Sequence, residues 1–191
     1  MLQKTELTGT SLGSVVDTPT TFESSPSVAT FKHPLRAYLD AHPEFDGIAV
    51  GACVFSPDNK LLLLQRAAHD SMPLLWEIPG GACDFDDESL LHAVARELWE
   101  ESRLHLNSIV NIVGDSDVFL TRRGLRMCKY SFAVVVDAYD VQLDPNEHKA
   151  FLWVTEEEAK ARKCGNVEFK YTTKQQENVV HEAFRLKKQM G

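Results

Sequence analysis

Residues 80–104 read "GGACDFDDESLLHAVARELWEESRL", and this stretch decides the fold because it joins a glycine loop to an acidic helix. Apolar residues recur three and four apart, which predicts a helix over about 88–102. Residues at those spacings are neighbours on a helix, so Glu97 faces both Glu100 and Glu101, and each like-charge pair costs about 0.2–0.5 kcal/mol. No Lys or Arg follows these glutamates at the compensating position four residues later. The pattern predicts a cation from outside the helix.

The three glutamates differ in their position around the helix. On a helical wheel, Glu97 and Glu101 fall along the edge of an apolar stripe, whereas Glu100 points farther toward solvent. The stripe consists of Leu90, Leu91, Val94 and Leu98. Carboxylates at the rim of a core are partly desolvated, so leaving them charged and unpaired costs free energy. A hard divalent cation relieves that cost, and Mg²⁺ typically uses a few carboxylates together with substrate phosphates.

A solvated acidic face is the alternative interpretation of this helix, since Glu-rich helices are common. The preceding loop weighs against that alternative. "IPGG" at 78–81 places Gly80 and Gly81 just ahead of the helix, where the backbone can approach a ligand without side-chain interference. We therefore expect the loop and the helix to form one ligand site.

Composition and charge narrow the class of protein. The chain has 191 residues, of which 43% are hydrophobic and 25% charged, as is typical of one globular domain. Its formal net charge of −8, without a basic stripe, argues against binding to long nucleic acids or anionic membranes. No apolar run approaches the ~20 residues that a membrane span needs. The start of the chain lacks the apolar core of a signal peptide, and its four cysteines form no CxxC pair, so we expect a cytoplasmic protein.

Residues 1–30 and 31–191 differ in pattern. The first segment is rich in Ser and Thr and lacks periodicity, so we expect a flexible arm or a loosely attached strand. From residue 31 onward, strand and helix patterns interleave, which predicts a single α/β domain. Within it, "SPDN" at 56–59 is typical of a turn, and we expect the apolar stretches 47–55 and 60–67 to pair as a hairpin.

Six further segments complete the expected order of elements. Strands are expected at 111–121, 127–139 and 150–154, and helices within 33–45, at 155–165 and from about 173 to 188. The helix at 155–165 is the best marked, because Thr155 and Glu158 form a capping box and Gly165 suits its end.

The loop and helix together resemble the signature of the Nudix hydrolases, which is Gly, five residues, Glu, seven residues, Arg-Glu-apolar-x-Glu-Glu-x-Gly-apolar. The residues in the signature positions are Gly81, Glu88, Arg96, Glu97, Leu98, Glu100, Glu101 and Leu104. Two departures occur: six residues rather than five separate Gly81 from Glu88, and Arg103 stands where the signature has glycine. The extra residue falls in a loop, where insertions are tolerated, and neither departure removes a carboxylate. "LWEIPGG" at 75–81 and "NEHKAFLWV" at 146–154 also look like their counterparts in that family.

The resemblance implies an α/β/α sandwich with a mixed β-sheet, and attack of a metal-activated water on a diphosphate linkage. The implied ligands of Mg²⁺ or Mn²⁺ are the Gly81 carbonyl and the side chains of Glu97, Glu100, Glu101 and Glu147. A carboxylate accepts the proton of the water, and Glu97, Glu100 and Glu147 all remain candidates for that role. Arg96 is expected to orient Glu100, while the alternative for Glu147 is an exposed turn glutamate.

Arginines offer candidate contacts for the substrate's phosphates. Arg122, Arg123 and Arg126 cluster in the loop "RRGLR" of an otherwise acidic chain, and Arg66 could project into the same cleft. The alternative is that the three loop arginines only keep a hairpin tip soluble.

The expected function is hydrolysis of a nucleoside diphosphate or triphosphate derivative, a small-molecule substrate. Two alternatives stay open: a prenyl diphosphate or inositol pyrophosphate hydrolase, and a non-catalytic module that binds a nucleotide. Because the helix retains all three of its glutamates, the enzyme is favoured over the binding module. The pattern indicates neither the base of the substrate nor the oligomeric state.

Overall fold

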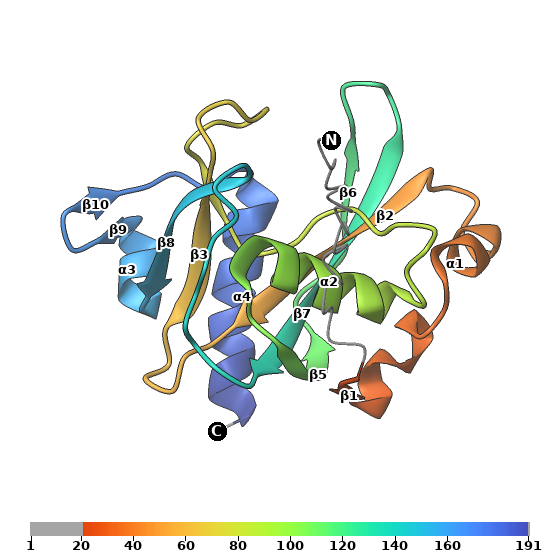
Figure 1. The fold of residues 1–191 in the computed structure, drawn as a ribbon, viewed down its shortest axis with the longest axis horizontal. Helices are drawn as coiled ribbons and strands as arrows, with labels where there is room; N and C mark the ends of the chain where they lie inside the picture. The colour runs from red at the N-terminus through yellow and green to blue at the C-terminus, as the bar shows by residue number, and fades with distance from the viewer. Residues whose placement is uncertain (1–20, 191) are drawn as a thin grey trace, which may run out of the picture.

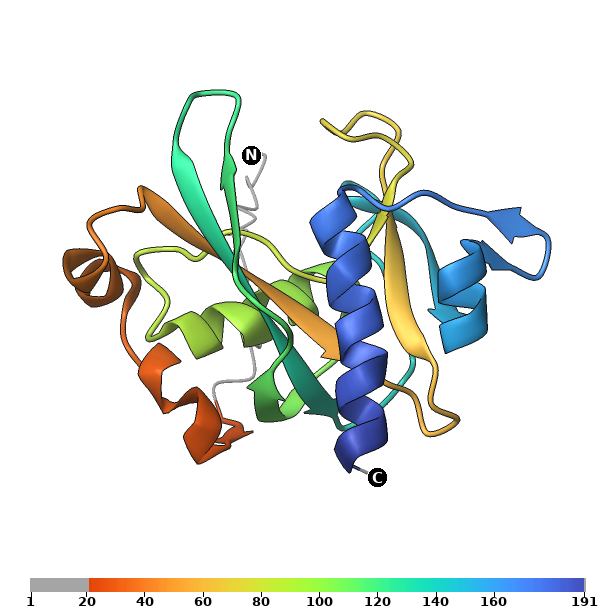
Figure 2. The ribbon, with the colours of Figure 1, turned by 180° about the vertical axis from the view of Figure 1, so that it is seen from behind.

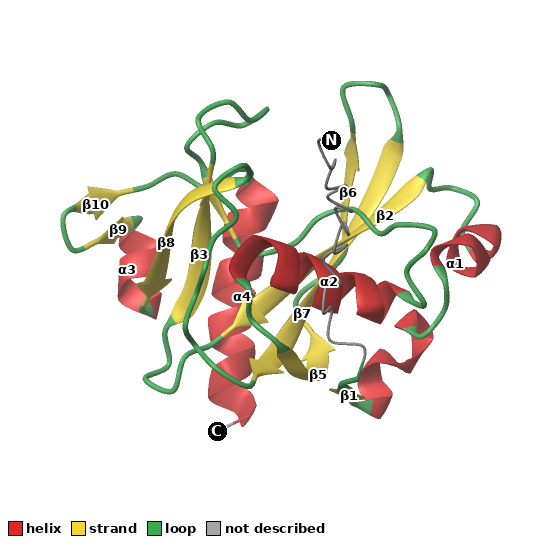
Figure 3. Cartoon of the chain, viewed as in Figure 1, coloured by secondary structure: helices red, strands yellow, loops and turns green. Residues whose placement is uncertain are grey.

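The computed structural model describes residues 21–190, which fold into a sandwich of helices around strands (Figure 1, Figure 3). The strands are β1 (Glu23–Ser24), β2 (Gly47–Val54), β3 (Leu61–Arg66), β4 (Trp76–Glu77), β5 (Leu106–Ile112), β6 (Asp117–Leu120), β7 (Arg126–Val136), β8 (His148–Val154), β9 (Lys163–Cys164) and β10 (Val167–Glu168). The helices are η1 (Pro26–Phe31), α1 (Leu35–Ala41), α2 (Leu90–Ser102), α3 (Glu156–Ala161) and α4 (Lys174–Met190). Helix α2 covers the strands on one side and α4 on the other, as the view from behind shows (Figure 2). The predicted α/β/α class is confirmed.

The strands form two main sheets and a small hairpin. The larger sheet has the order β1–β5–β7–β2, and β6 pairs with β7 as well. Its β1–β5 and β2–β7 pairs are parallel, whereas its β5–β7 and β6–β7 pairs are antiparallel, so this sheet is mixed as expected. The smaller sheet has the order β4–β3–β8 with antiparallel pairs, and β9 pairs with β10.

Strand β2 and the four leucines that begin β3 are buried on both faces. Along β3, Leu62 and Leu64 join the core that contains the α2 residues, whereas Leu61 and Leu63 join the core that contains the α4 residues. All four leucines are fully buried. Successive side chains of a strand point to opposite faces, so an unbroken apolar run is the pattern of a strand enclosed on both sides.

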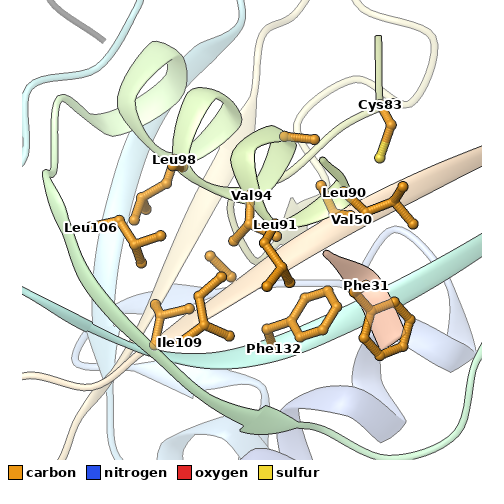
Figure 4. Packing of buried hydrophobic residues seen from close by; sticks show 14 of the residues in the cluster. Phe31, Val50, Cys83, Leu90, Leu91, Val94, Leu98, Leu106, Ile109 and Phe132 are labelled. Carbon is orange, nitrogen blue, oxygen red and sulfur yellow. The ribbon is translucent and has the colours of Figure 1, made fainter. Parts of the chain in front are cut away.

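Helix α2 packs on the larger sheet through the predicted apolar stripe. Figure 4 shows Leu90, Leu91, Val94 and Leu98 above Leu106, Ile109 and Phe132 of the sheet. Burying one such leucine stabilises the fold by roughly 1.5–3 kcal/mol relative to exposing it. The helix begins at Leu90, two residues after the predicted start, because the Ser89 hydroxyl accepts a hydrogen bond from the His92 N–H and caps the helix there.

The predicted hairpin between 47–55 and 60–67 is wrong beyond its turn. The turn itself is present, since Ser56 N donates to Lys60 O at 2.8 Å. Past that point the two strands enter different sheets, where β2 pairs with β7 and β3 pairs with β8. Both strands are apolar on both faces, so the local pattern identifies two strands without selecting their partners.

The described part of the predicted N-terminal arm is packed on the domain. Strand β1 pairs with β5, and Val28 of η1 is fully buried in the core beside α2. The packed fold therefore begins before residue 31, with elements too short to leave a periodic signal. Residues 1–20 of that arm lie outside the described residues.

Two further differences from prediction change the order of elements. The expected strand at 111–121 is divided between β5 and β6, with Gly114 at a φ of +66° in the turn between them. The helix expected at 155–165 has its capping box but ends at Ala161, because Arg162 takes a left-handed conformation and the chain continues into β9. Among residues 21–190, no helix combines the length and apolar character that crossing a membrane requires.

Candidate active site

A cavity of about 280 Å³ lies beside the C-terminal half of α2, and all four predicted carboxylates line it. The charged and histidine side chains that line it include Glu97, Glu100, Glu101, Glu147, His148 and Arg66. They come from α2, from the end of β3 and from the start of β8, while the glycine loop closes the remaining side. The structure therefore brings together residues that the chain separates by up to about eighty positions.

The three glutamates of α2 have the exposures that the helical wheel predicts. The side chains of Glu97 and Glu101 are 12% and 6% exposed, whereas that of Glu100 is 43% exposed. The first two lie where the apolar stripe meets the cavity. Two carboxylates are thus held largely out of bulk water, and the third remains half in contact with it.

Arg96 supplies part of the positive charge that the acidic helix needs. Its Nη1 donates to Glu100 Oε2 at 3.0 Å, which is the predicted contact, and also to Glu97 Oε1 at 2.7 Å. Its Nε and Nη2 hold the two oxygens of Asp87 at 2.9 and 3.0 Å, and Nη2 also donates to the carbonyl of Ala82. The helix therefore supplies part of the compensating positive charge itself, through Arg96. The same side chain ties the glycine loop to the helix.

Both glycines of the loop lie beside the glutamates of α2. Gly80, at a φ of +148°, donates its N–H to Glu101 Oε2 at 2.7 Å. A Cβ added at Gly81 would lie 2.5 Å from Glu97 Oε2. The Gly81 carbonyl, an implied metal ligand, accepts a hydrogen bond from Val50 N at 2.8 Å, which leaves one of its lone pairs for a further partner.

The segment entering β8 places two side chains at the cavity. Glu101, Glu147 and His148 each offer a potential ligand atom, and these atoms all lie within 4.8 Å of one another. The Glu147 carbonyl accepts a hydrogen bond from Ala67 N at 2.8 Å, which fixes this segment against the end of β3. Sequence reasoning missed His148 as a site residue, because a histidine at the start of an apolar strand has no pattern that separates it from an ordinary core residue.

Arg66 lines the cavity as predicted, but carboxylates engage two of its nitrogens. Its Nη1 donates to Glu77, and its Nη2 donates to Asp70 Oδ1 at 2.6 Å. Glu77 lies on β4 and is 5% exposed. Burial alone would raise the pKa of Glu77, but His148, Lys129 and Arg66 outweigh burial, and the pKa lies below its usual value. Glu77 therefore lies behind the lining of the cavity, where it holds Arg66, and sequence reasoning did not identify it.

Residues 21–190 compensate the buried glutamates of α2 only in part with positive charge. Burial raises the pKa of Glu101 well above its usual value, with a further rise from the nearby Glu77 carboxylate and an opposing effect of the Gly80 N–H. Burial also raises the pKa of Glu97, against the opposing effect of Arg96. Among residues 21–190, no Lys or Arg side chain lies within ion-pairing distance of Glu101. This set of carboxylate oxygens fits a hard divalent cation, which would offset that excess charge.

The hairpin arginines lie outside the lining of the cavity. Arg122 extends from the hairpin to the loop that follows β3, where its Nη2 donates to Ser71 O at 3.1 Å. Arg126 packs over the ring of Phe45 at 5.9 Å, and Arg123 is exposed at the hairpin tip. Of the three, only Arg122 reaches the loop that carries the cavity residue Asp70.

Comparisons with known proteins agree with this arrangement. A family model described as the NUDIX domain matches residues 46–175. The human m7GpppN-mRNA hydrolase NUDT17 is 33% identical over 137 residues, which cover 62% of this chain but only 42% of that protein. The CTP pyrophosphohydrolase of Escherichia coli (strain K12) is 33% identical over 112 residues, which cover 59% of this chain and 78% of that protein. The crystal structure of a MutT protein from Methanosarcina mazei Go1 matches with a TM-score of 0.57 and 26% identity, covering 74% of this chain and 94% of that one.

Proposed function

The chain belongs to the NUDIX family, and on that basis we propose that it is a hydrolase dependent on Mg²⁺ or Mn²⁺ that cleaves a phosphoanhydride linkage in a nucleoside diphosphate or triphosphate derivative. One observation carries this proposal: four glutamates from α2 and the β8 segment converge on a single cavity beside a glycine loop. The names of both curated relatives specify a phosphorylated nucleotide, which supports a nucleotide substrate.

Glu97, Glu100 and Glu101 would hold the cation, with the Gly81 carbonyl at the edge of the same set. When bound there, Mg²⁺ lowers the pKa of a coordinated water and neutralises negative charge on the phosphate oxygens. The protein keeps the carboxylates in place beforehand. Arg96 fixes Glu97 and Glu100, and the Gly80 N–H fixes Glu101.

We assign the proton-accepting role to Glu147. The carboxylates of Glu97 and Glu100 already accept hydrogen bonds from Arg96, which leaves fewer of their oxygens open to an attacking water. The Glu147 carboxylate makes no hydrogen bond to any of residues 21–190 and is exposed at the edge of the cavity, where an attacking water can reach it. Its backbone is nevertheless held by Ala67, so its position is defined.

The substrate is a small diphosphate-containing molecule, and the arginines are candidates for binding its phosphates. Arg66 lies in the cavity, where a phosphate oxygen could replace one of its carboxylate partners. Arg122, with Arg123 and Arg126 behind it on the hairpin, could hold terminal phosphates that extend out of the cavity. The four cysteines are free thiols, which supports a cytoplasmic location.

Two alternatives predict different substrates or no turnover. A prenyl diphosphate or an inositol pyrophosphate offers the same linkage without a base. A non-catalytic module that binds a nucleotide is disfavoured, because all four carboxylates are retained and all line the cavity.

The test is turnover on a substrate panel with Mg²⁺ or Mn²⁺. The panel contains CTP and the other nucleoside triphosphates, their oxidised forms, capped RNA, dinucleoside polyphosphates, prenyl diphosphates and inositol pyrophosphates. Glu97→Gln should lower turnover more than about 100-fold, beyond the 10–100-fold typical of residues that only orient metal ligands. Glu157→Gln, an exposed helix glutamate outside the cavity, is the matched control and should act as wild type. The absence of turnover on the whole panel, or an active Glu97→Gln variant, would overturn the proposal.

A further inference from the structure

His148 is a buried polar side chain whose hydrogen-bonding capacity is unused. Its side chain is 2% exposed, and neither Nδ1 nor Nε2 has a hydrogen-bond partner among the described residues. Buried polar groups are nearly always satisfied in native proteins, because an unpaired one loses its hydration without replacement. An unsatisfied imidazole at the wall of the cavity therefore needs an explanation beyond packing.

The imidazole lies between two buried carboxylates from different elements. Its Nε2 is 3.9 Å from Glu77 Oε1 on β4 and 3.9 Å from Glu101 Oε1 on α2. Both separations exceed those of a hydrogen bond, and a small movement of the ring or of either carboxylate would close one of them. The ring is thus directed at the acidic cluster without yet being bonded to it.

Both carboxylates are anchored on their other sides. Glu77 accepts a hydrogen bond from Arg66, whose other amino group holds Asp70. Glu101 Oε2 accepts the Gly80 N–H at 2.7 Å. A hydrogen bond from His148 would therefore connect Glu101 to the group formed by Arg66 and Glu77.

Hydrogen bonds and strand pairing hold the backbone around His148, and this backbone sets the direction of its ring. The His148 N–H donates to Asp144 O at 2.9 Å. The pairing of β3 with β8 shifts register between Gln65 and Arg66, opposite His148. Irregularities of this kind turn a side chain away from the regular alternation of a strand, and they occur preferentially beside functional sites.

We propose that His148 is a positioning residue, whose Nε2–H donates to the Glu101 carboxylate and holds it in the orientation that binds the divalent cation. The proposal rests on the proposed function, because the group it positions is a metal-holding carboxylate. Residues that hydrogen-bond to metal-ligating groups fix the orientation of those groups, and their loss typically lowers metal affinity about 10–100-fold. Glu77, held by Arg66, faces the same nitrogen at 3.9 Å.

The experiment measures Mn²⁺ binding to the purified protein by calorimetry, so the readout does not depend on turnover. His148→Phe keeps the ring volume and removes both nitrogens, and its Mn²⁺ dissociation constant should rise about 10–100-fold. His148→Gln keeps an N–H near the Nε2 position, so its Mn²⁺ dissociation constant should stay within about threefold of wild type, a much smaller change than that of His148→Phe. Val154→Ala, on the same strand in the opposite core, lowers thermal stability without touching the cavity and should bind Mn²⁺ as wild type does.

The outcomes separate this inference from the proposed function. Wild-type binding with equally tight binding by His148→Phe would overturn the role of His148 and leave the proposed function intact. If the wild type bound no Mn²⁺, the metal-dependent function would fail and the inference with it. Pulsed electron paramagnetic resonance of bound Mn²⁺ should show no directly coordinated imidazole nitrogen, and such a signal would overturn positioning in favour of ligation.

Discussion

Arg96 and Glu97 are consecutive residues of α2, yet Arg96 Nη1 reaches Glu97 Oε1 at 2.7 Å. Consecutive side chains on a helix do not normally face each other, so this contact depends on the arginine folding back toward the glycine loop. The same guanidinium holds both oxygens of Asp87. A single side chain thus limits the repulsion within the acidic helix and joins the loop to it.

Loss of Arg96 should therefore destabilise the fold as well as the site. Arg96→Ala leaves partly buried carboxylates unpaired and should lower the free energy of unfolding by about 3 kcal/mol, the lower end of the range for a broken buried pair. Arg96→Lys should recover little of this, because one ammonium group cannot reproduce the planar fork on Asp87. Urea unfolding measures both variants. A lysine variant as stable as wild type would show that charge alone matters.

The backbone conformation at Arg103 explains why the Nudix signature has glycine at this position. The residue ends α2 in a left-handed conformation, with a φ of +58°. A side chain other than glycine costs roughly 1–2 kcal/mol in that conformation. Arg103→Gly should therefore be more stable than Arg103→Ala by about 1 kcal/mol in thermal or urea unfolding.

Both Arg103 variants lose the contact of the guanidinium with the Trp99 ring at 5.1 Å, so their difference isolates the backbone. Equal stability of the two would contradict the assigned left-handed helix end.

Gly81 should be needed for the site far more than for the fold. A Cβ there would lie 2.5 Å from Glu97 Oε2, which is the far end of a flexible side chain. Gly81→Ala should therefore displace the Glu97 carboxylate and lower turnover more than about 10-fold, with little change in melting temperature.

The matched control for Gly81 is Gly47→Ala, whose added Cβ would meet only the end of the Met127 side chain, away from the cavity. It should keep wild-type turnover. If both alanine variants had the same turnover, the close approach of the loop to Glu97 would have no functional role.

The pattern of residues predicted the placement of the acidic side chains well and the strand pairing poorly. The positions of Glu97, Glu100 and Glu101 follow from the period of a helix, so a wheel drawn from the sequence already separates the two buried side chains from the half-exposed one. The partners of β2 and β3 depend on residues more than seventy positions away, which a local pattern cannot select. His148 escaped prediction because its role depends on the pairing of β3 with β8, and Glu77 because its role depends on contacts with Arg66 and His148.

Glu101 should make the metal-free protein less stable as pH rises. Its pKa is raised in the folded state by burial and by Glu77, so the folded protein binds this proton more tightly than the unfolded chain does. Stability falls with pH wherever the native state binds more protons, here from about pH 4.5 upward until the raised pKa is passed. Glu101→Gln should therefore have a higher melting temperature than wild type at pH 7 without divalent cations.

With Mg²⁺ present, the wild type should have a higher melting temperature than Glu101→Gln. Mg²⁺ should raise the melting temperature of the wild type by mass action and have less effect on Glu101→Gln. A glutamine variant less stable than wild type at pH 7 in a chelator would contradict the charge imbalance assigned to this carboxylate.

The most direct test of the central claim is the initial rate of phosphoanhydride hydrolysis as a function of Mg²⁺ concentration, for wild type and Glu100→Gln. Glu100 is the best carboxylate to change because its side chain is 43% exposed, so the variant should fold normally. We expect no turnover in a chelator, a rate that saturates with Mg²⁺ in the wild type, and a loss of more than about 100-fold in the variant, beyond the loss from a residue that only orients ligands. Turnover that is independent of divalent cations, or a Glu100→Gln variant as active as wild type, would contradict that claim.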